Sequence, residues 1–148
     1  MGEETVHATA VLVGNRAALI RGPAGSGKTR LALALIDAAH TGVLPFARLV
    51  ADDRVRLSVA HGRLIATAPD AIRGLVEVRG LGIRTLPHEA RAVVGLVVDL
   101  AAADGRRMAA EAGREIVLLG VKLPRLAVAA GQEPLPMVLG RVSTLAGA

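Results

Sequence analysis

The sequence lacks cysteine, tryptophan and tyrosine, and Phe46 is its only aromatic residue. Without cysteine, the chain forms neither disulfides nor zinc–thiolate sites. Proteins that bind single-stranded nucleic acid stack the bases on aromatic side chains, and one phenylalanine provides no such platform. Long apolar runs are also missing, because no stretch reaches the roughly 18 apolar residues that indicate a membrane-spanning helix.

Positive charge is plentiful but scattered along the chain. The net charge is +5, and the 18 basic residues are 16 arginines and two lysines, Lys28 and Lys122. Because dispersed charge is a weak sign of nucleic-acid binding, we predict no nucleic-acid partner. The first ten residues, MGEETVHATA, lack the basic-then-apolar pattern of a signal peptide, so the predicted location is cytoplasmic, with no membrane contact.

The chain is long enough for one compact domain with a core, since 52% of its 148 residues are hydrophobic. No repeat, linker or low-complexity tract divides it, so we predict a single domain over residues 1–148. Apolar patterning predicts a β-rich mixed α/β fold with one main helix at 28–39. The expected strands are 6–13, 16–20, 49–51, 54–59, 63–67, 75–78, 82–84, 92–100, 116–119 and 121–123, with a terminal helix over 132–145.

A glycine-rich segment connects the predicted strand 16–20 to the main helix. It matches the pattern G-x-x-x-x-G-K-[ST] with Gly22, Pro23, Ala24, Gly25, Ser26, Gly27, Lys28 and Thr29. Its glycines let several backbone N–H groups face one anion, and the helix N-terminus adds positive charge. Composition alone gives about one chance match in 600 such chains. The segment therefore predicts a loop that binds the phosphates of ATP, with Lys28 on the phosphates and Thr29 on Mg²⁺.

Carboxylates that serve this loop come from either of two predicted strands. One strand ends on Asp52 and Asp53, and the other carries Asp99 near its end. A single aspartate at a strand end usually caps a turn. An adjacent pair is more informative, because the chain can turn both side chains toward one ligand there. One would act as a base, and the other would orient a metal or a histidine.

Three further residues are candidates with an ordinary structural alternative. His7 lies in the predicted strand 6–13, where a histidine is more often structural than catalytic. Glu77 and Arg79 are two positions apart on a predicted strand that bends at Arg79-Gly80, and so they share a face. Such a pair is usually a salt bridge. Beside a phosphate loop, it would supply a metal ligand and a cation that stabilises the transition state.

The order of these motifs resembles the catalytic domain of the HPr kinase/phosphorylase family. His7 comes first, then the loop Gly22–Thr29, then Val50-Ala51-Asp52-Asp53, and then Glu77-Val78-Arg79-Gly80-Leu81-Gly82-Ile83. The last segment is similar to that family's own signature, and the resemblance covers about residues 5–100. It implies a P-loop domain related to phosphoenolpyruvate carboxykinase, in which Asp99 is a core or edge residue.

The resemblance also implies roles for individual residues. The loop would bind ATP, with Lys28 on its phosphates, and Thr29 and Glu77 would be the ligands of Mg²⁺. Asp53 would accept the proton of the substrate serine and return it in the reverse direction.

Three other residues receive supporting roles from the same resemblance. Asp52 would support Asp53, and His7 would orient and tune that aspartate. Arg79 belongs to the signature segment, which the family uses in both directions.

Two departures from the family pattern accompany this resemblance. Long members carry a domain before the kinase domain, whereas this chain is similar to the short alphaproteobacterial form without it. The family's later segment P-V-R-P-G-R-N is absent, and Val121–Arg125 is its expected remnant, with Arg125 as candidate for a late catalytic arginine. That region serves dephosphorylation and hexamer assembly in long members, so the reverse reaction and the oligomeric state stay open.

The sequence therefore predicts an ATP-dependent serine protein kinase. Its partner would be HPr or an HPr-like phosphocarrier, and its output would be regulation of phosphotransferase signalling and of carbon and nitrogen metabolism. Two alternatives stay open: a P-loop kinase acting on a small molecule, and a regulatory module that senses ATP without catalysis.

Overall fold

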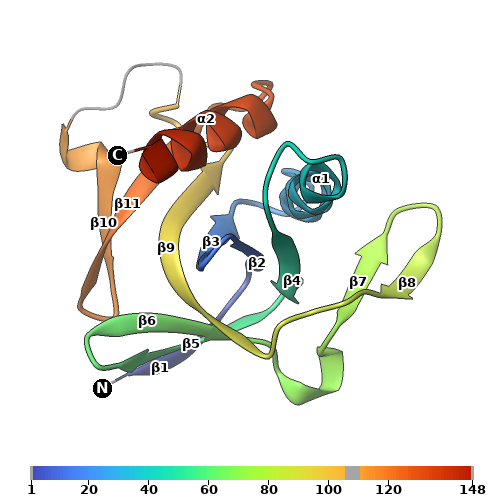
Figure 1. The fold of residues 1–148 in the computed structure, drawn as a ribbon. Coiled ribbons are helices and arrows are strands. Elements are labelled where there is room, and N and C mark those ends of the chain that lie inside the picture. The colour runs from blue at the N-terminus through green and yellow to red at the C-terminus, as the bar shows by residue number, and fades with distance from the viewer. Residues whose placement is uncertain (1, 106–110, 148) are drawn as a thin grey trace.

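The computed structural model describes residues 2–105 and 111–147 (Figure 1). Its elements along the chain are β1 (Glu3–Val6), β2 (Thr9–Val13), β3 (Arg16–Arg21), α1 (Lys28–His40), β4 (Ala47–Ala51), β5 (Val55–Ala60), β6 (Arg63–Thr67), η1 (Asp70–Ile72), β7 (Leu75–Val78), β8 (Gly82–Thr85), β9 (Arg91–Leu100), η2 (Glu111–Arg114), β10 (Glu115–Leu118), β11 (Val121–Val128) and α2 (Pro134–Gly147). No helix among the described residues is long and apolar enough to cross a membrane.

One large curled sheet organises the molecule, and β9 is its central strand. The order is β1-β5-β6-β9-β3-β2-β4, and β11 also pairs with β9 and carries β10 on its other side. The β3–β9 and β9–β11 pairs are parallel, whereas the remaining pairs of this sheet are antiparallel. The carboxyl ends of β3, β9 and β11 therefore lie together, which is where ligands bind in open α/β sheets.

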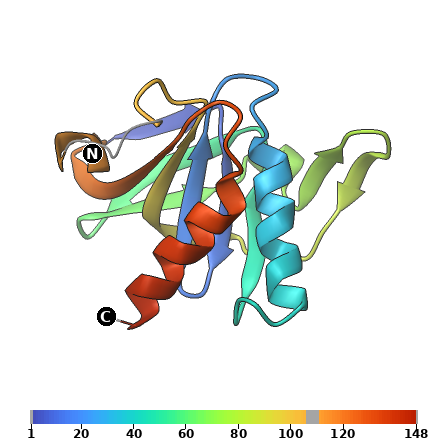
Figure 2. The same cartoon turned by 90° about the horizontal axis from the view of Figure 1, so that it is seen from above.

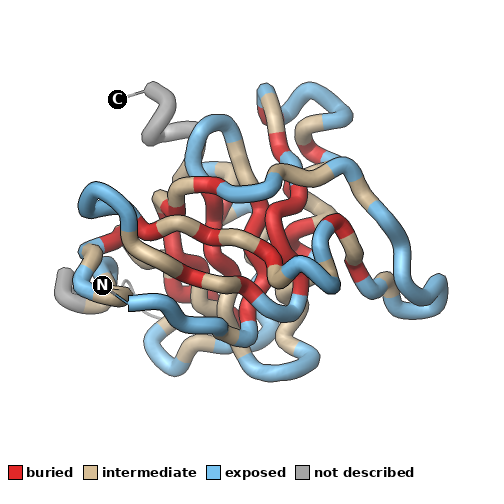
Figure 3. The backbone as a smooth tube through the Cα atoms, turned by 90° about the horizontal axis from the view of Figure 1, so that it is seen from below, coloured by how far each residue is buried: buried red, intermediate tan, exposed pale blue. Residues whose placement is uncertain are grey.

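The strands of this sheet bury both of their faces. In β3, Leu19 belongs to a core cluster inside the curl, with residues of β5 and β6, while Ile20 belongs to a second cluster with α1. The two helices pack side by side over that second face (Figure 2). Buried residues accordingly concentrate along the central strands (Figure 3). This near-continuous apolar pattern is what parallel strands covered on both faces require.

Strands β7 and β8 form a separate two-stranded sheet that projects from the body beside α1 (Figures 1 and 2). Its base is anchored by Val76, which is buried, and by the amide of Leu86, which donates to the carbonyl of Gly74. Every residue of β8 is exposed. The hairpin is thus an outlying arm fixed at one end.

The predicted fold class, a β-rich mixed α/β domain with its main helix after the loop, is confirmed, and three predicted details are wrong. The strand predicted over 6–13 is two strands, with His7 and Ala8 at the corner between them. Arg79 lies in the turn after β7, so it does not share a strand face with Glu77. Strand β11 continues to Val128, five residues beyond the end of the strand predicted over 121–123.

Candidate active site

The glycine-rich loop occupies the connection from β3 to α1, as the sequence predicts. Gly27 has φ +100° at the N-cap of α1, a left-handed conformation that side chains disfavour. At Gly22, a Cβ atom would lie 2.5 Å from Ser26 Oγ and 3.1 Å from the carbonyl oxygen of Leu100. The loop therefore packs too tightly against the end of β9 to accept a side chain at Gly22.

The beginning of α1 is prepared for an anion. The helix has no side-chain cap at its N-terminus and no acidic residue in its first turn, so its first amides lack intrahelical acceptors. Ser26 Oγ is buried without a hydrogen-bond partner among the described residues. Lys28 Nζ donates to the loop's own carbonyls, at 2.8 Å to Gly22 and 3.2 Å to Pro23. These free donors and the neighbouring ammonium group fit a chain of phosphates.

Asp52 is the carboxylate that contacts the loop. It is only 5% exposed, and its Oδ1 accepts hydrogen bonds from the hydroxyls of Thr29 at 2.7 Å and Thr9 at 2.9 Å. Its Oδ2 accepts the backbone N–H of Glu77 at 3.4 Å. The sheet explains this cluster, because β2 pairs antiparallel with both β3 and β4, so that its start lies at their ends. Asp52 is thus a fixed link between three segments.

The side chain of Asp53 lies in a different environment from the side chain of Asp52. The side chains of His7 and Asp53 are 67% and 65% exposed, and His7 Nε2 lies 3.6 Å from Asp53 Oδ1. Asp53 has φ +71°, a strained conformation for a residue with a side chain. The amide of Ala8 donates to its carbonyl oxygen at 3.3 Å, which ties the corner between β1 and β2 to the end of β4. The aspartate pair therefore has one buried and one accessible carboxylate.

Glu77 and Arg79 approach the site from the projecting hairpin. The backbone of Glu77 is held by Asp52, while its side chain is exposed. Arg79 is exposed in the turn, and within residues 2–105 and 111–147 its guanidinium has no ion-pair or hydrogen-bond partner. The salt bridge that was the ordinary structural alternative for this pair is therefore not formed.

The second candidate carboxylate, Asp99, belongs to an ion-pair network beneath the loop. Arg21 donates to it through Nε at 2.7 Å and Nη2 at 2.8 Å, and Arg125 donates through Nε at 2.7 Å. Arg125 also donates to Asp104 at 2.8 Å. Burial raises the pKa of Asp99, but hydrogen bonds and charges from the two arginines outweigh it, so the pKa falls below its ordinary value.

Arg125 is the residue of this network with the most partners. Arg125 hydrogen-bonds to both aspartates and to the carbonyl of Gly113, and its side chain is mostly buried. The carboxylates likewise raise the pKa of the Arg125 guanidinium. Asp99 faces these arginines, while Thr29 is bonded to Asp52. The network joins the three parallel strands β3, β9 and β11, and its Arg21 directly precedes the first residue of the loop.

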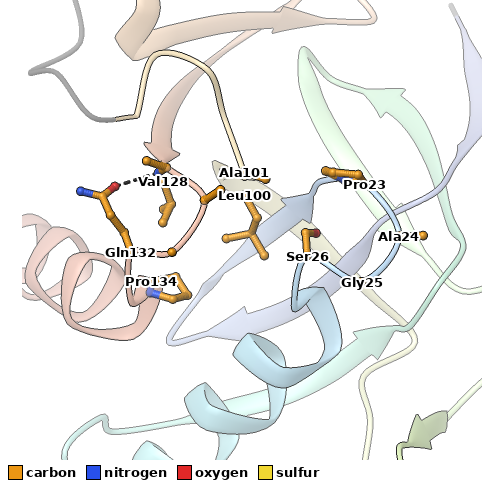
Figure 4. Close-up of a pocket in the computed structure, with 12 residues that line it drawn as sticks. Pro23, Ala24, Gly25, Ser26, Leu100, Ala101, Val128, Gln132 and Pro134 are labelled. Atoms are coloured by element: carbon orange, nitrogen blue, oxygen red, sulfur yellow. Dashed lines mark hydrogen bonds between the residues drawn. The ribbon is translucent and has the colours of Figure 1, made fainter.

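A cavity of about 330 Å³ opens beside the loop (Figure 4). Pro23–Ser26 line one side, Leu100 and Ala101 follow β9 between the two sides, and Val128–Gln132 with Pro134 line the other side. The side chain of Gln132 stabilises the segment between β11 and α2, because its Oε1 accepts a hydrogen bond from the amide of Ala129 at 2.7 Å. The walls are mostly apolar and the loop amides are adjacent, as in sites for small ligands.

The donor set at the loop fits Mg²⁺. Among the described residues, no three histidine, aspartate or glutamate side chains gather into a metal cage. Mg²⁺ does not need one, since it usually takes one or two protein oxygens together with phosphate oxygens and water. The Thr29 hydroxyl donates its hydrogen to Asp52, which leaves its lone pairs free to coordinate, and the Glu77 backbone is bonded to the same carboxylate.

Thr9 is the residue that sequence reasoning missed. It and Asp52 are the buried polar side chains in the part of the chain that the structure describes. A lone threonine in the apolar run Ala8–Val13 was the available signal, because buried polar groups in strands need partners. Its partner is 43 residues away, and nothing local indicates which residue that is.

Comparison with known proteins agrees with this architecture. Residues 1–130 match the family described as HPr Serine kinase C-terminal domain. The chain belongs to this family. Because the predicted resemblance rested on the loop, the aspartate pair and the Glu77–Ile83 segment, those motifs identified an HPr serine kinase C-terminal domain correctly.

Individual curated relatives are longer than this chain. The chain is 35% identical over 137 residues to the HPr kinase/phosphorylase of Geobacillus thermodenitrificans (strain NG80-2), covering 83% of this chain and 41% of the relative. The same protein of Clostridium tetani (strain Massachusetts / E88) is 41% identical over 85 residues, covering 57% of this chain and 26% of the relative. The chain thus spans less than half the length of these curated relatives.

A solved structure supports the fold alone. The Hpr(Ser) kinase/phosphatase from Coxiella burnetii superposes with a TM-score of 0.78 at 24% identity, covering 97% of this chain and 90% of that one. The curled sheet and its helices are therefore the architecture of that kinase structure.

Proposed function

We propose that this chain transfers the γ-phosphoryl group of ATP to a serine hydroxyl of HPr or an HPr-like phosphocarrier protein, with Mg²⁺. The observation that carries the proposal is that the two adjacent aspartates lie in different environments. Asp52 is buried and bonded to the Thr29 hydroxyl of the phosphate loop, while Asp53 is exposed beside His7. Relatives named HPr kinase/phosphorylase support the choice of acceptor.

The nucleotide side is supported by the loop and the adjoining cavity. The free amides of α1 would bind the phosphates, and Lys28 would leave the carbonyls of Gly22 and Pro23 to reach them. Residues 128–134 and Leu100 would contact the nucleoside. Thr29 and Glu77 would hold Mg²⁺, with Asp52 orienting the Thr29 hydroxyl. When bound, the metal neutralises charge that develops on the phosphates.

The acceptor side is supported by the accessible carboxylate. As the serine oxygen forms its bond to the γ-phosphorus and the bond to the β-phosphate oxygen breaks, ADP leaves and the serine proton passes to Asp53. His7 would orient that carboxylate from 3.6 Å, and Arg79 would stabilise charge on the transferred group. The wide exposure of His7 and Asp53 favours a macromolecular acceptor over a small metabolite enclosed in a pocket.

The two lysines give a matched test. We expect label from γ-labelled ATP to appear on a carrier serine with wild type and with Lys122→Ala, and to fall about a hundredfold or more with Lys28→Ala. Lys122 is an exposed residue paired with Glu115 on β10, remote in sequence from the loop, so it controls for loss of a lysine.

Three results would contradict the proposal. Label on a metabolite with none on any carrier would indicate a small-molecule kinase. Tight MgATP binding without transfer to any acceptor would indicate a nucleotide-sensing module. Equal transfer by wild type and Lys28→Ala would remove the loop from the reaction. Adding inorganic phosphate to the labelled carrier then tests the reverse, phosphorylase direction.

A further inference from the structure

The projecting hairpin exposes apolar side chains that the fold does not use. Leu81 and Ile83 are 61% and 65% exposed, at the turn and in β8. The other large exposed hydrophobic residues of the described chain are Val43 and Val117, which lie on different elements. Leu81 and Ile83 are only two positions apart on this arm, and exposed apolar side chains that gather in one place mark sites of interaction.

The register of the hairpin places this surface beside the candidate site. Ile83 is the cross-strand partner of Glu77, and directly paired residues project from the same face of a two-stranded sheet. Side chains paired in this way lie about 5 Å apart at Cβ. The backbone of Glu77 is in turn bonded to Asp52. An exposed isoleucine therefore flanks the carboxylate that is proposed to hold the metal.

Arg79 is the cation beside this surface. It is exposed in the turn two residues after Glu77, whereas Arg84, which is also exposed, is the cross-strand partner of Val76 and so projects from the opposite face to Ile83. Within the described residues, neither guanidinium has an ion-pair partner. A partner that covers Leu81 and Ile83 would bring carboxylates near Arg79 at little desolvation cost if they stayed at the rim.

We propose that Leu81 and Ile83 are the docking contact for the acceptor protein, which presents an apolar patch beside its phosphorylatable hydroxyl and acidic residues toward Arg79. The inference rests on the proposed function, because the occupant is the protein that receives the phosphoryl group. The hairpin fixes the acceptor relative to Asp53 and the loop without contributing to nucleotide binding. Specificity for a protein substrate then comes from an arm outside the phosphate site.

Serine substitutions on the arm test this docking contact. In Leu81→Ser and Ile83→Ser, we expect kcat/KM for the carrier to fall about tenfold each, as for apolar side chains at the centre of an interface. The dissociation constant of MgATP, measured without carrier, should stay within about twofold of wild type, because the cavity and loop are untouched. Val117→Ser is the matched control, since Val117 is 63% exposed on β10, and it should leave both quantities unchanged.

The outcomes separate the docking surface from the reaction itself. Wild type that phosphorylates a carrier, together with arm variants whose kcat/KM is unchanged, would overturn the docking surface and leave the kinase proposal intact. Wild type that phosphorylates no carrier would overturn both. Arm variants that shift the sedimentation coefficient of the enzyme alone would identify the surface as a contact between copies of this chain, which also overturns the proposal. A tenfold loss confined to the carrier would support it.

Discussion

At the scale of single residues, two adjacent aspartates acquire opposite environments from one change of backbone direction. Strand β4 ends at Ala51, and the left-handed conformation of Asp53 turns its side chain away from that of Asp52. Asp52 is enclosed by hydroxyl donors, and Asp53 faces solvent with His7. Two adjacent carboxylates in the sequence indicated a site. Which of them is buried and which is exposed became clear only from the structure.

Thr9 gives the first residue-scale prediction. Thr9→Val keeps the shape and the strand preference of the side chain but removes one of two hydroxyl donors to Asp52 Oδ1. We expect the Mg²⁺-dependent part of ATP affinity to weaken about tenfold, because the carboxylate that orients Thr29 loses a charge-assisted hydrogen bond of about 1.5–3 kcal/mol. Titration calorimetry with and without Mg²⁺ measures this difference.

Thr9→Ser is the control for this prediction. It restores a hydroxyl at the same position and should recover most of the Mg²⁺ dependence. If Thr9→Val lowered the unfolding midpoint but left the Mg²⁺-dependent affinity at the wild-type value, Thr9 would be a purely structural partner of Asp52.

At the scale of elements, the pattern of apolar residues predicted the helices and strands that depend on consecutive residues alone. The alanine- and leucine-rich segment predicted as a helix over 28–39 forms α1 from Lys28 to His40, and the apolar run 92–100 forms β9. The bend at His7 was missed, because neither a glycine nor a proline lies between Val6 and Val13 to mark a corner. Arg79 was assigned to a strand face although it begins the turn, since the glycine at position 80 marks a bend but does not specify which residue ends the strand.

The site outside the loop was less predictable, because its contacts join distant segments. Arg21 meets Asp99 across 78 positions, and Thr29 meets Asp52 across 23. The cavity takes its walls from three loops that only the parallel order of β3, β9 and β11 brings together. Hydrophobic periodicity identifies strands but does not specify which strands are neighbours, so these contacts depend on topology.

The cavity supplies the element-scale prediction. Ala130 is an exposed lining residue after β11, and Ala130→Leu would fill part of the space between the loop and α2. We expect the dissociation constant of MgATP to rise about tenfold through steric overlap, while that of Mg-tripolyphosphate, which needs only the loop, stays unchanged. Competition binding with both ligands measures the two constants.

A matched variant is available on β5, where Ala60→Leu adds the same bulk at an exposed strand end far from the cavity lining. It should leave both constants unchanged. An equal loss of affinity for ATP and tripolyphosphate in Ala130→Leu would mean that the cavity does not hold the nucleoside.

At the scale of the whole molecule, the ion-pair network connects stability to the geometry of the site. Arg21 precedes Gly22 directly, and Asp99 precedes Leu100, which packs against that glycine. Arg125 extends the connection to β11, and Asp104 extends it to the segment that follows β9. Strands that position the phosphate loop and the cavity are thus held together by charges, in addition to the two apolar clusters.

This network makes stability depend on pH in a direction that can be derived. Arg21 and Arg125 lower the pKa of Asp99 in the folded chain below the value of about 3.9 that applies when the chain is unfolded. The stabilisation is therefore present above about pH 4 and is lost as the pH falls through the folded pKa, because the unfolded state then binds the proton more readily. We expect the urea midpoint of wild type to fall steeply below about pH 4.

In Asp99→Asn, that pH dependence should be flatter, and the free energy of unfolding at pH 7 should be lower by about 2–3 kcal/mol, because two largely buried guanidinium groups lose their shared carboxylate. Asp70→Asn is the control, since Asp70 pairs with Arg73 on an exposed surface, where such a pair contributes less than about 1 kcal/mol. Urea titrations between pH 7 and 3 compare the three proteins. Parallel curves for wild type and Asp99→Asn would show that the network contributes nothing pH-dependent to folding, and the loop would then depend on the apolar clusters alone for its support.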